Sequence, residues 1–144
     1  MSRLYGVWRG GRQTPHGGEF LQASALLVRR EAFEEVGGFD EQFFMYGEDA
    51  DLCARLRDAG WGVAVCGEAR FVHIGGGSTG AEGERMAIEL LRSWLRLIAK
   101  RKSLRQADRA RRWLRVALLL RRREPAAAAW LGSGRAADLL DLRE

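Results

Sequence analysis

Residues 20–79 read FLQASALLVRREAFEEVGGFDEQFFMYGEDADLCARLRDAGWGVAVCGEARFVHIGGGST, and this stretch indicates the fold class. The apolar run Phe20–Val28 at its start is flanked by polar residues, which is typical of a short buried strand. We predict a helix over Glu48–Ala59, because apolar side chains recur on one of its faces at helical spacing. A buried strand combined with an amphipathic helix predicts an α/β fold class for this part of the chain.

Shorter elements surround these two. A short helix is predicted over Arg30–Val36, and Gly37 ends it because glycine adopts the left-handed conformation at little cost. Val63–Val65 and Arg70–Ile74 are predicted to be short strands. Residues 1–19 are rich in glycine and arginine, which predicts a loop or lead-in.

The sequence changes character after residue 80. Two amphipathic helices are predicted over Glu84–Lys100 and Leu104–Arg123, and the inward face of the second includes Trp113 and Ala117. A last short helix is predicted over Ala126–Leu142.

The length of 144 residues is that of one domain with a modest core. Within it we distinguish a lead-in (1–19), an α/β part (20–80) and a basic helical tail (81–144). The two cysteines, Cys53 and Cys66, have neither a disulfide pattern nor zinc-ligand spacing, which suits a reducing compartment.

The net charge of +5 is unevenly distributed. Residues 1–80 hold 8 basic and 11 acidic side chains, a net charge of −3, whereas residues 81–144 hold 16 and 8, a net charge of +8. The tail therefore predicts an anionic neighbour, such as phosphate, nucleic acid or an anionic lipid surface. No recognised nucleic-acid-binding module is present, and apolar stripes with Trp and Arg favour the membrane surface.

Strictly apolar runs such as Val116–Leu120 are far shorter than the roughly 20 residues of a membrane-spanning helix. The first residues contain no apolar segment of the kind found in secretory signals. We therefore expect a cytoplasmic location, with the tail peripheral at the inner face of the cell membrane.

Three acidic residues, Glu48, Asp49 and Asp51, fall within four positions at the start of a predicted helix. Acidic side chains stabilise a helix N-terminus by about 0.3–1 kcal/mol each, so a structural role is one interpretation. The other is that one carboxylate serves as a general base. Asp51 and Arg55 have the spacing of an ion pair along the helix.

His73 is followed closely by a run of glycines. A single histidine at a strand end is usually structural, and it does not hold Mg²⁺ or Mn²⁺ without further ligands. The glycines form a plain loop, or they allow backbone N–H groups to approach a phosphate. The residues alone leave both alternatives open.

Four elements follow one another in a fixed order: the apolar strand with RREAF, then GGFDE, YGEDADLCARL and H-x-G-G. In this order they resemble the C-terminal half of inverting family 2 glycosyltransferases, notably the rhamnosyltransferase-like group. The resemblance implies part of a GT-A fold, a Rossmann-like α/β layer with a mixed sheet, followed here by an amphipathic helical tail. It implies transfer of a sugar from a UDP- or dTDP-sugar to a glycan or polyprenyl-linked acceptor in cell-wall polysaccharide biosynthesis.

The same resemblance assigns the acceptor side of the site. Asp49 corresponds to the general base, which removes the proton of the acceptor hydroxyl as the new bond forms. Glu48, Tyr46 and Phe44 correspond to the residues that contact the acceptor.

On the donor side, Ser24 corresponds to the sugar pocket and His73 to a ligand of a divalent metal, Mg²⁺ or Mn²⁺. The metal would stabilise the leaving diphosphate as a Lewis acid. The residues expected to lie over the diphosphate are Gly75, Gly76 and Gly77.

The donor half of the family, with its Asp-x-Asp motif, does not precede this segment. We therefore expect a fragment, a truncated product or one half of a split enzyme that is inactive alone. An incomplete sheet also predicts an exposed edge, and with it self-association or a partner chain. The alternatives are a non-catalytic carbohydrate-binding or assembly subunit and a basic module that binds a membrane or nucleic acid.

Overall fold

The computed structural model describes residues 2–9, 21, 23–72, 83–121 and 125–140. Two compact units make up the chain. Unit 1 comprises Met1–Phe43 and Glu48–Gly75, and unit 2 comprises Phe44–Gly47 and Gly76–Glu144.

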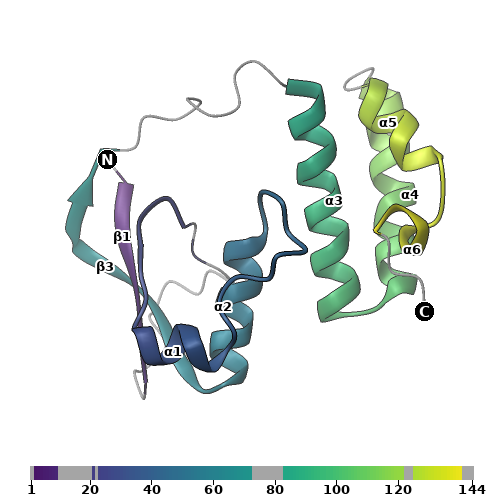
Figure 1. Ribbon diagram of the computed structural model, residues 1–144. Helices are drawn as coiled ribbons and strands as arrows, with labels where there is room; N and C mark the ends of the chain where they lie inside the picture. Colours follow the sequence, from purple (N-terminus) through teal and green to yellow (C-terminus); the bar gives the residue numbers. More distant parts are fainter. Residues whose placement is uncertain (1, 10–20, 22, 73–82, 122–124, 141–144) are drawn as a thin grey trace. The chain divides into compact units, whose positions relative to one another are not determined.

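Unit 1 contains a three-stranded sheet in the order β2-β1-β3, of which Figure 1 labels β1 and β3. The strands are β1 (Ser2–Arg9), β2 (Leu26–Leu27) and β3 (Trp61–Phe71). β1 runs parallel to β2 and antiparallel to β3, so the sheet is mixed. A bulge between Arg3 and Leu4 shifts the register between β1 and β3.

The loop predicted over residues 1–19 is wrong for its first part, because Ser2–Arg9 is the central strand β1. The prediction rested on the glycine and arginine content of this segment. The pairs Leu4-Tyr5 and Val7-Trp8 nevertheless have a strong preference for strands. Pairing with β3 and β2 on both sides then stabilises this strand. Residues 10–20 lie outside the described part of the chain.

Two other strand predictions need correction. A 3₁₀ turn, η1 (Ala23–Ala25), occupies the middle of the predicted strand Phe20–Val28, and the strand β2 follows it. The strands predicted over Val63–Val65 and Arg70–Ile74 are one continuous strand, since β1 pairs with both ends of β3.

The helices of unit 1 are α1 (Arg30–Glu35) and α2 (Glu48–Asp58), close to the predicted bounds. Gly37 ends the turn after α1 with φ of 75°, as expected for a left-handed position. The core of the unit consists of buried residues from α1, α2 and β3: Ala32, Leu52, Leu56 and Trp61.

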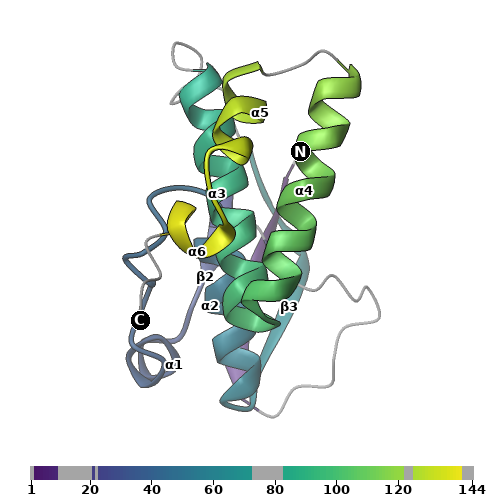
Figure 2. The ribbon, with the colours of Figure 1, turned by 90° about the vertical axis from the view of Figure 1, so that its right-hand side faces the viewer.

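Unit 2 contains α3 (Gly83–Arg101), α4 (Leu104–Arg121), α5 (Pro125–Gly132) and α6 (Ala136–Leu139). Helices α3 and α4 are antiparallel neighbours joined by a short connection, and α5 and α6 pack beside them (Figure 2). The core of this unit is formed by Leu95, Leu131 and Leu140.

The inward face of α4 is narrower than predicted. Leu114 and Leu118 pack against the core, whereas Trp113 is 75% exposed and Ala117 is also exposed. Both lie beside the inward stripe, which small residues such as Ala107 already fill.

The predicted last helix is divided into α5 and α6. The break is stabilised by Asp108 of α4, whose carboxylate accepts the Ala136 backbone N–H at 2.8 Å. None of the helices in the described ranges has the length and apolar character needed to cross a membrane.

Candidate functional site

The segment that leads into α2 has an unusual backbone. Tyr46 has φ of 66° and Gly47 has φ of 80°, so two successive residues are left-handed. Glycine tolerates this conformation, but for Tyr46 it costs on the order of 1 kcal/mol. Non-glycine residues with such strain cluster at functional sites, and Tyr46 comes two positions before Glu48.

The Asp49 carboxylate has a fixed orientation in the first turn of α2. Its Oδ2 accepts the backbone N–H of Ala23 at 3.1 Å, and its Oδ1 accepts that of Ala50 at 2.8 Å. A carboxylate has about four lone-pair sites, so each oxygen keeps acceptor capacity for a further proton donor. Asp49 is therefore an oriented carboxylate that can still accept a proton.

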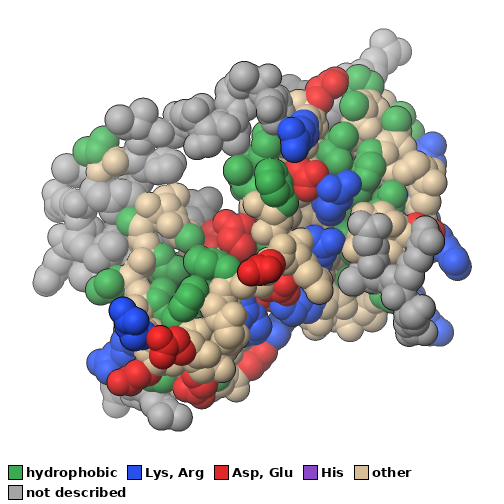
Figure 3. Space-filling model, viewed as in Figure 1, with side chains coloured by type: hydrophobic (Ala, Val, Ile, Leu, Met, Phe, Trp, Pro, Cys, Tyr) green, Lys and Arg blue, Asp and Glu red, His purple; other side chains and the backbone are tan. Residues whose placement is uncertain are grey.

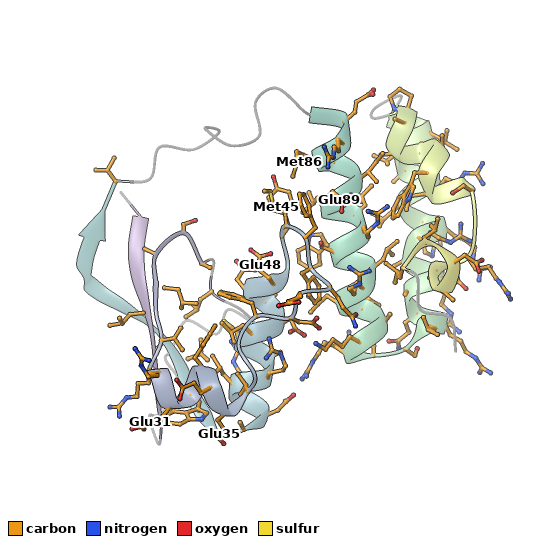
Figure 4. All side chains as sticks on the ribbon, in the orientation of Figure 1. Glu31, Glu35, Met45, Glu48, Met86 and Glu89 are labelled. Atoms are coloured by element: carbon orange, nitrogen blue, oxygen red, sulfur yellow. The ribbon has the colours of Figure 1, made fainter. Side chains whose placement is uncertain are left out.

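Glu48 is in a different environment. Its side chain is half-buried at the N-terminal end of α2 (Figure 4), and the buried Oε2 makes no hydrogen bond with the described residues. Burial raises the pKa of Glu48, and the negative charge of Asp49 adds to this, while a hydrogen bond from the backbone N–H of Glu48 opposes it. The two neighbouring acids therefore differ. Hydrogen bonds fix the Asp49 carboxylate, whereas burial reduces the solvation of the Glu48 carboxylate.

The third acid of the segment is structural. Asp51 is fully buried, and its Oδ2 accepts a hydrogen bond from Arg55 Nε at 2.7 Å. Arg55 also donates from Nη1 to the Val36 carbonyl at 2.5 Å, which ties α2 to the end of α1. The predicted ion pair is confirmed, and its role is to hold the helix in place.

Phe44 and Tyr46 belong to unit 2, in which the segment Phe44–Gly47 packs with α3. Ser93 Oγ donates to the Met45 carbonyl at 2.8 Å, and the Arg85 guanidinium lies 5.9 Å from the centre of the Phe44 ring. Figure 4 shows Met45 in this segment, with Met86 and Glu89 on α3. Phe44 is 65% exposed, so its ring is available to a ligand.

The predicted donor-side residues are only partly described. Ser24 is exposed in η1, next to the Ala23 N–H that binds Asp49, so the fold brings this turn to the start of α2. His73 and the glycines Gly75, Gly76 and Gly77 lie outside the described residues.

The predicted divalent metal would need several acidic, histidine or cysteine ligands close together. In the described parts of the chain, no three or more His, Cys, Asp or Glu side chains gather as metal ligands would. The described residues alone do not make a divalent-metal centre.

Two contributors to this geometry were missed from the sequence. Ala23 acts through its backbone N–H, which no side-chain pattern reveals. The position of Ser93 between Leu91 and Leu95 on a helix could have indicated a buried polar residue. In the structure its side chain is 2% exposed. Buried hydroxyls of this kind have a hydrogen-bond partner, here the Met45 carbonyl.

Comparison with known proteins gives matches in this region. Residues 17–77 match the family model described as the N-terminal domain of galactosyltransferase. Over 63 residues the chain is 51% identical to the N-acetylglucosaminyl-diphospho-decaprenol L-rhamnosyltransferase of Mycobacterium tuberculosis. Residues 17–77 are therefore similar to glycosyltransferase-family proteins. The predicted resemblance to rhamnosyltransferase-like enzymes is thereby confirmed.

Two further rhamnosyltransferases are similar to part of this chain. Rhamnosyltransferase WbbL of Escherichia coli is 50% identical over 42 residues, which cover 29% of this chain and 16% of that protein. O-antigen chain rhamnosyltransferase WbaN of Salmonella anatum is 39% identical over 54 residues, 38% of this chain and 17% of that protein. The match to the mycobacterial enzyme covers 44% of this chain and 20% of the relative. No solved structure matches the chain.

Proposed function

We propose that this chain supplies the acceptor-side part of a sugar transferase that inverts the anomeric centre of a nucleotide sugar. The observation that carries the proposal is the anchored carboxylate of Asp49 inside the glycosyltransferase segment. The mixed sheet and the helix that presents Asp49 are consistent with part of a GT-A fold.

In the proposed reaction, Asp49 is the general base. The acceptor hydroxyl oxygen bonds to the anomeric carbon while the bond from that carbon to the diphosphate oxygen breaks. The hydroxyl proton passes to Asp49, and the nucleoside diphosphate leaves with the electron pair. Hydrogen bonds from Ala23 and Ala50 support this role, because a base acts efficiently only when its orientation is fixed.

The remaining roles follow the resemblance. Glu48, Tyr46 and Phe44 contact the acceptor, and the exposed Phe44 ring is of the kind on which sugars pack. Ser24 contributes to the sugar pocket. His73 and the glycines Gly75, Gly76 and Gly77 face the diphosphate, with Mg²⁺ or Mn²⁺ as the expected metal.

The relatives suggest the substrates. Their names specify rhamnose transfer, and the name of the mycobacterial relative specifies L-rhamnose and an N-acetylglucosaminyl-diphospho-decaprenol acceptor. We propose a UDP- or dTDP-activated 6-deoxyhexose such as L-rhamnose as donor and a polyprenyl-linked or glycan acceptor. Because the chain spans 20% of the mycobacterial relative, we further propose that it needs a donor-binding half for activity.

A segment exchange tests the proposal. The aligned residues of the mycobacterial rhamnosyltransferase are replaced by the corresponding 63 residues of this chain, and L-rhamnose transfer is measured. We expect the exchanged enzyme to be active and the isolated chain to be inactive. A folded exchange enzyme that binds the acceptor without transferring sugar would instead support the carbohydrate-binding alternative.

A further inference from the structure

Helix α4 has a large exposed face with two kinds of side chain. We call it the α4 outer face, and its members are Arg105, Arg109, Arg112, Trp113, Val116, Leu119 and Leu120. The exposed fractions are 75% for Trp113, 80% for Leu120 and 57% for Leu119. Arginines occupy the first half of this face and apolar side chains the second.

The opposite face of α4 packs against the core of unit 2. Ala107 is completely buried, and Leu114 and Leu118 pack on the core formed by Leu95, Leu131 and Leu140. The apolar side chains of the α4 outer face are therefore not required for the fold of this unit. Exposed apolar side chains grouped on one helix face mark a site of interaction.

The charged side chains of the α4 outer face are all arginines. Asp108, the acidic residue of α4, is directed away from it: the carboxylate accepts hydrogen bonds from Arg111 Nε at 3.2 Å and from the Ala136 N–H at 2.8 Å. Arg111 in turn donates to the Leu131 carbonyl. The acid is neutralised inside the unit, and Arg105, Arg109 and Arg112 remain exposed.

The occupant must satisfy arginines and apolar side chains together. Nucleic-acid phosphates would take the arginines but leave Leu119 and Leu120 in water. At an anionic bilayer surface, the guanidinium groups bind the lipid phosphates while Trp and Leu enter the boundary of the acyl chains. Since no described helix can cross a membrane, such a helix would lie in the plane of the interface.

We propose that the α4 outer face binds an anionic phospholipid surface. The contact requires Trp113 and Leu120 as apolar anchors and Arg109 and Arg112 as phosphate ligands. It does not depend on sugar transfer, so the two proposals succeed or fail separately.

Vesicle binding by the full chain tests this proposal. Co-sedimentation is measured with phosphatidylcholine vesicles, with and without phosphatidylglycerol. We expect binding to the anionic vesicles, weakened by salt, and little binding to the neutral ones. Replacing Trp113→Gln and Leu120→Gln together should lower affinity at least about tenfold. Each of Arg109→Gln and Arg112→Gln should lower it about fivefold.

The controls separate a specific face from general basic charge. Arg30→Gln removes an exposed cation of unit 1 and should leave binding unchanged. Circular dichroism spectra and melting curves check that each variant folds. Equal loss with Arg30→Gln, or no binding to anionic vesicles, would overturn the proposal. So would a dimer in solution that dissociates on changing Trp113 and Leu120, because the occupant would then be a second copy.

Discussion

The Asp49 carboxylate accepts the backbone N–H of Ala23 at 3.1 Å, although 26 residues separate the two in the sequence. This hydrogen bond joins the start of α2 to the η1 turn that carries Ser24. The residue proposed as the base is thus also a link within unit 1. Its substitution must be tested for stability before its effect on activity is interpreted.

Asp49→Ala should destabilise unit 1. The Ala23 and Ala50 N–H groups would lose their acceptor, at a cost of about 1–3 kcal/mol in the free energy of unfolding. Chemical denaturation measures the loss. Glu41→Ala, which changes an exposed acid of the same unit, is the control and should change stability far less. An equal effect of the two substitutions would contradict the anchoring role.

Glu48→Gln should stabilise the protein in a pH-dependent manner. The folded-state pKa of Glu48 lies above its ordinary value of 4.5, mainly because of burial, so ionisation costs folding free energy. Below the unfolded pKa the carboxyl is protonated in both states, and the variant and the parent should melt alike. As pH rises through the folded pKa, the parent loses stability and the glutamine variant does not.

Melting temperatures of both proteins from pH 4 to pH 8 measure this difference. It should grow with pH and then level off. A constant difference across that range would show that Glu48 is as well solvated in the folded state as in the unfolded state. It would remove the argument that burial distinguishes Glu48 from Asp49.

Arg55→Ala should be strongly destabilising. Asp51 is completely buried, and Arg55 Nε lies 2.7 Å from its Oδ2. Removing the cation from a buried ion pair costs about 3–5 kcal/mol, because the carboxylate charge remains in the interior. Urea denaturation measures this cost. Arg30→Ala, which breaks an exposed ion pair with Glu34, is the comparison, and a similar loss there would contradict a specific contribution of the buried Asp51–Arg55 pair.

Ser93→Ala should loosen the segment that carries Phe44 and Tyr46. The substitution removes the hydrogen bond from Ser93 Oγ to the Met45 carbonyl, worth about 1 kcal/mol. Amide hydrogen exchange over Phe44–Gly47 should become faster. Ser133→Ala removes a hydroxyl-to-carbonyl bond of the same length, 2.8 Å, at an exposed site and should leave this exchange unchanged. Unaltered exchange in Ser93→Ala would contradict the role of α3 in holding the segment.

Much of the fold followed from local pattern. The helices α1, α2 and α3 were predicted within a few residues, because glycine stops such as Gly37 and amphipathic spacing are local signals. The strands were predicted less accurately than the helices. β1 depends on pairing with residues 61–71, far along the chain, and the sequence around it is dominated by glycine and arginine.

The candidate site was also predicted only in part from the sequence. The acids Glu48 and Asp49 were identified from composition and position at a helix start, and the pairing of Asp51 with Arg55 from their spacing. The different environments of Glu48 and Asp49 could not be predicted from the sequence, because Asp49 accepts a hydrogen bond from a backbone N–H in a distant turn. The exposure of Trp113 was also missed, since helical spacing alone does not fix the width of a buried face.

The role of Asp49 as base is tested most directly by sugar transfer in the exchanged rhamnosyltransferase, with Asp49→Asn beside Asp58→Asn. General-base catalysis contributes about 10²–10⁴-fold, so kcat should fall by that factor in Asp49→Asn. Asp58→Asn should remain near the parent value, with melting curves confirming that both variants fold. Transfer by a folded Asp49→Asn enzyme at the parent rate would contradict the account and assign the base elsewhere.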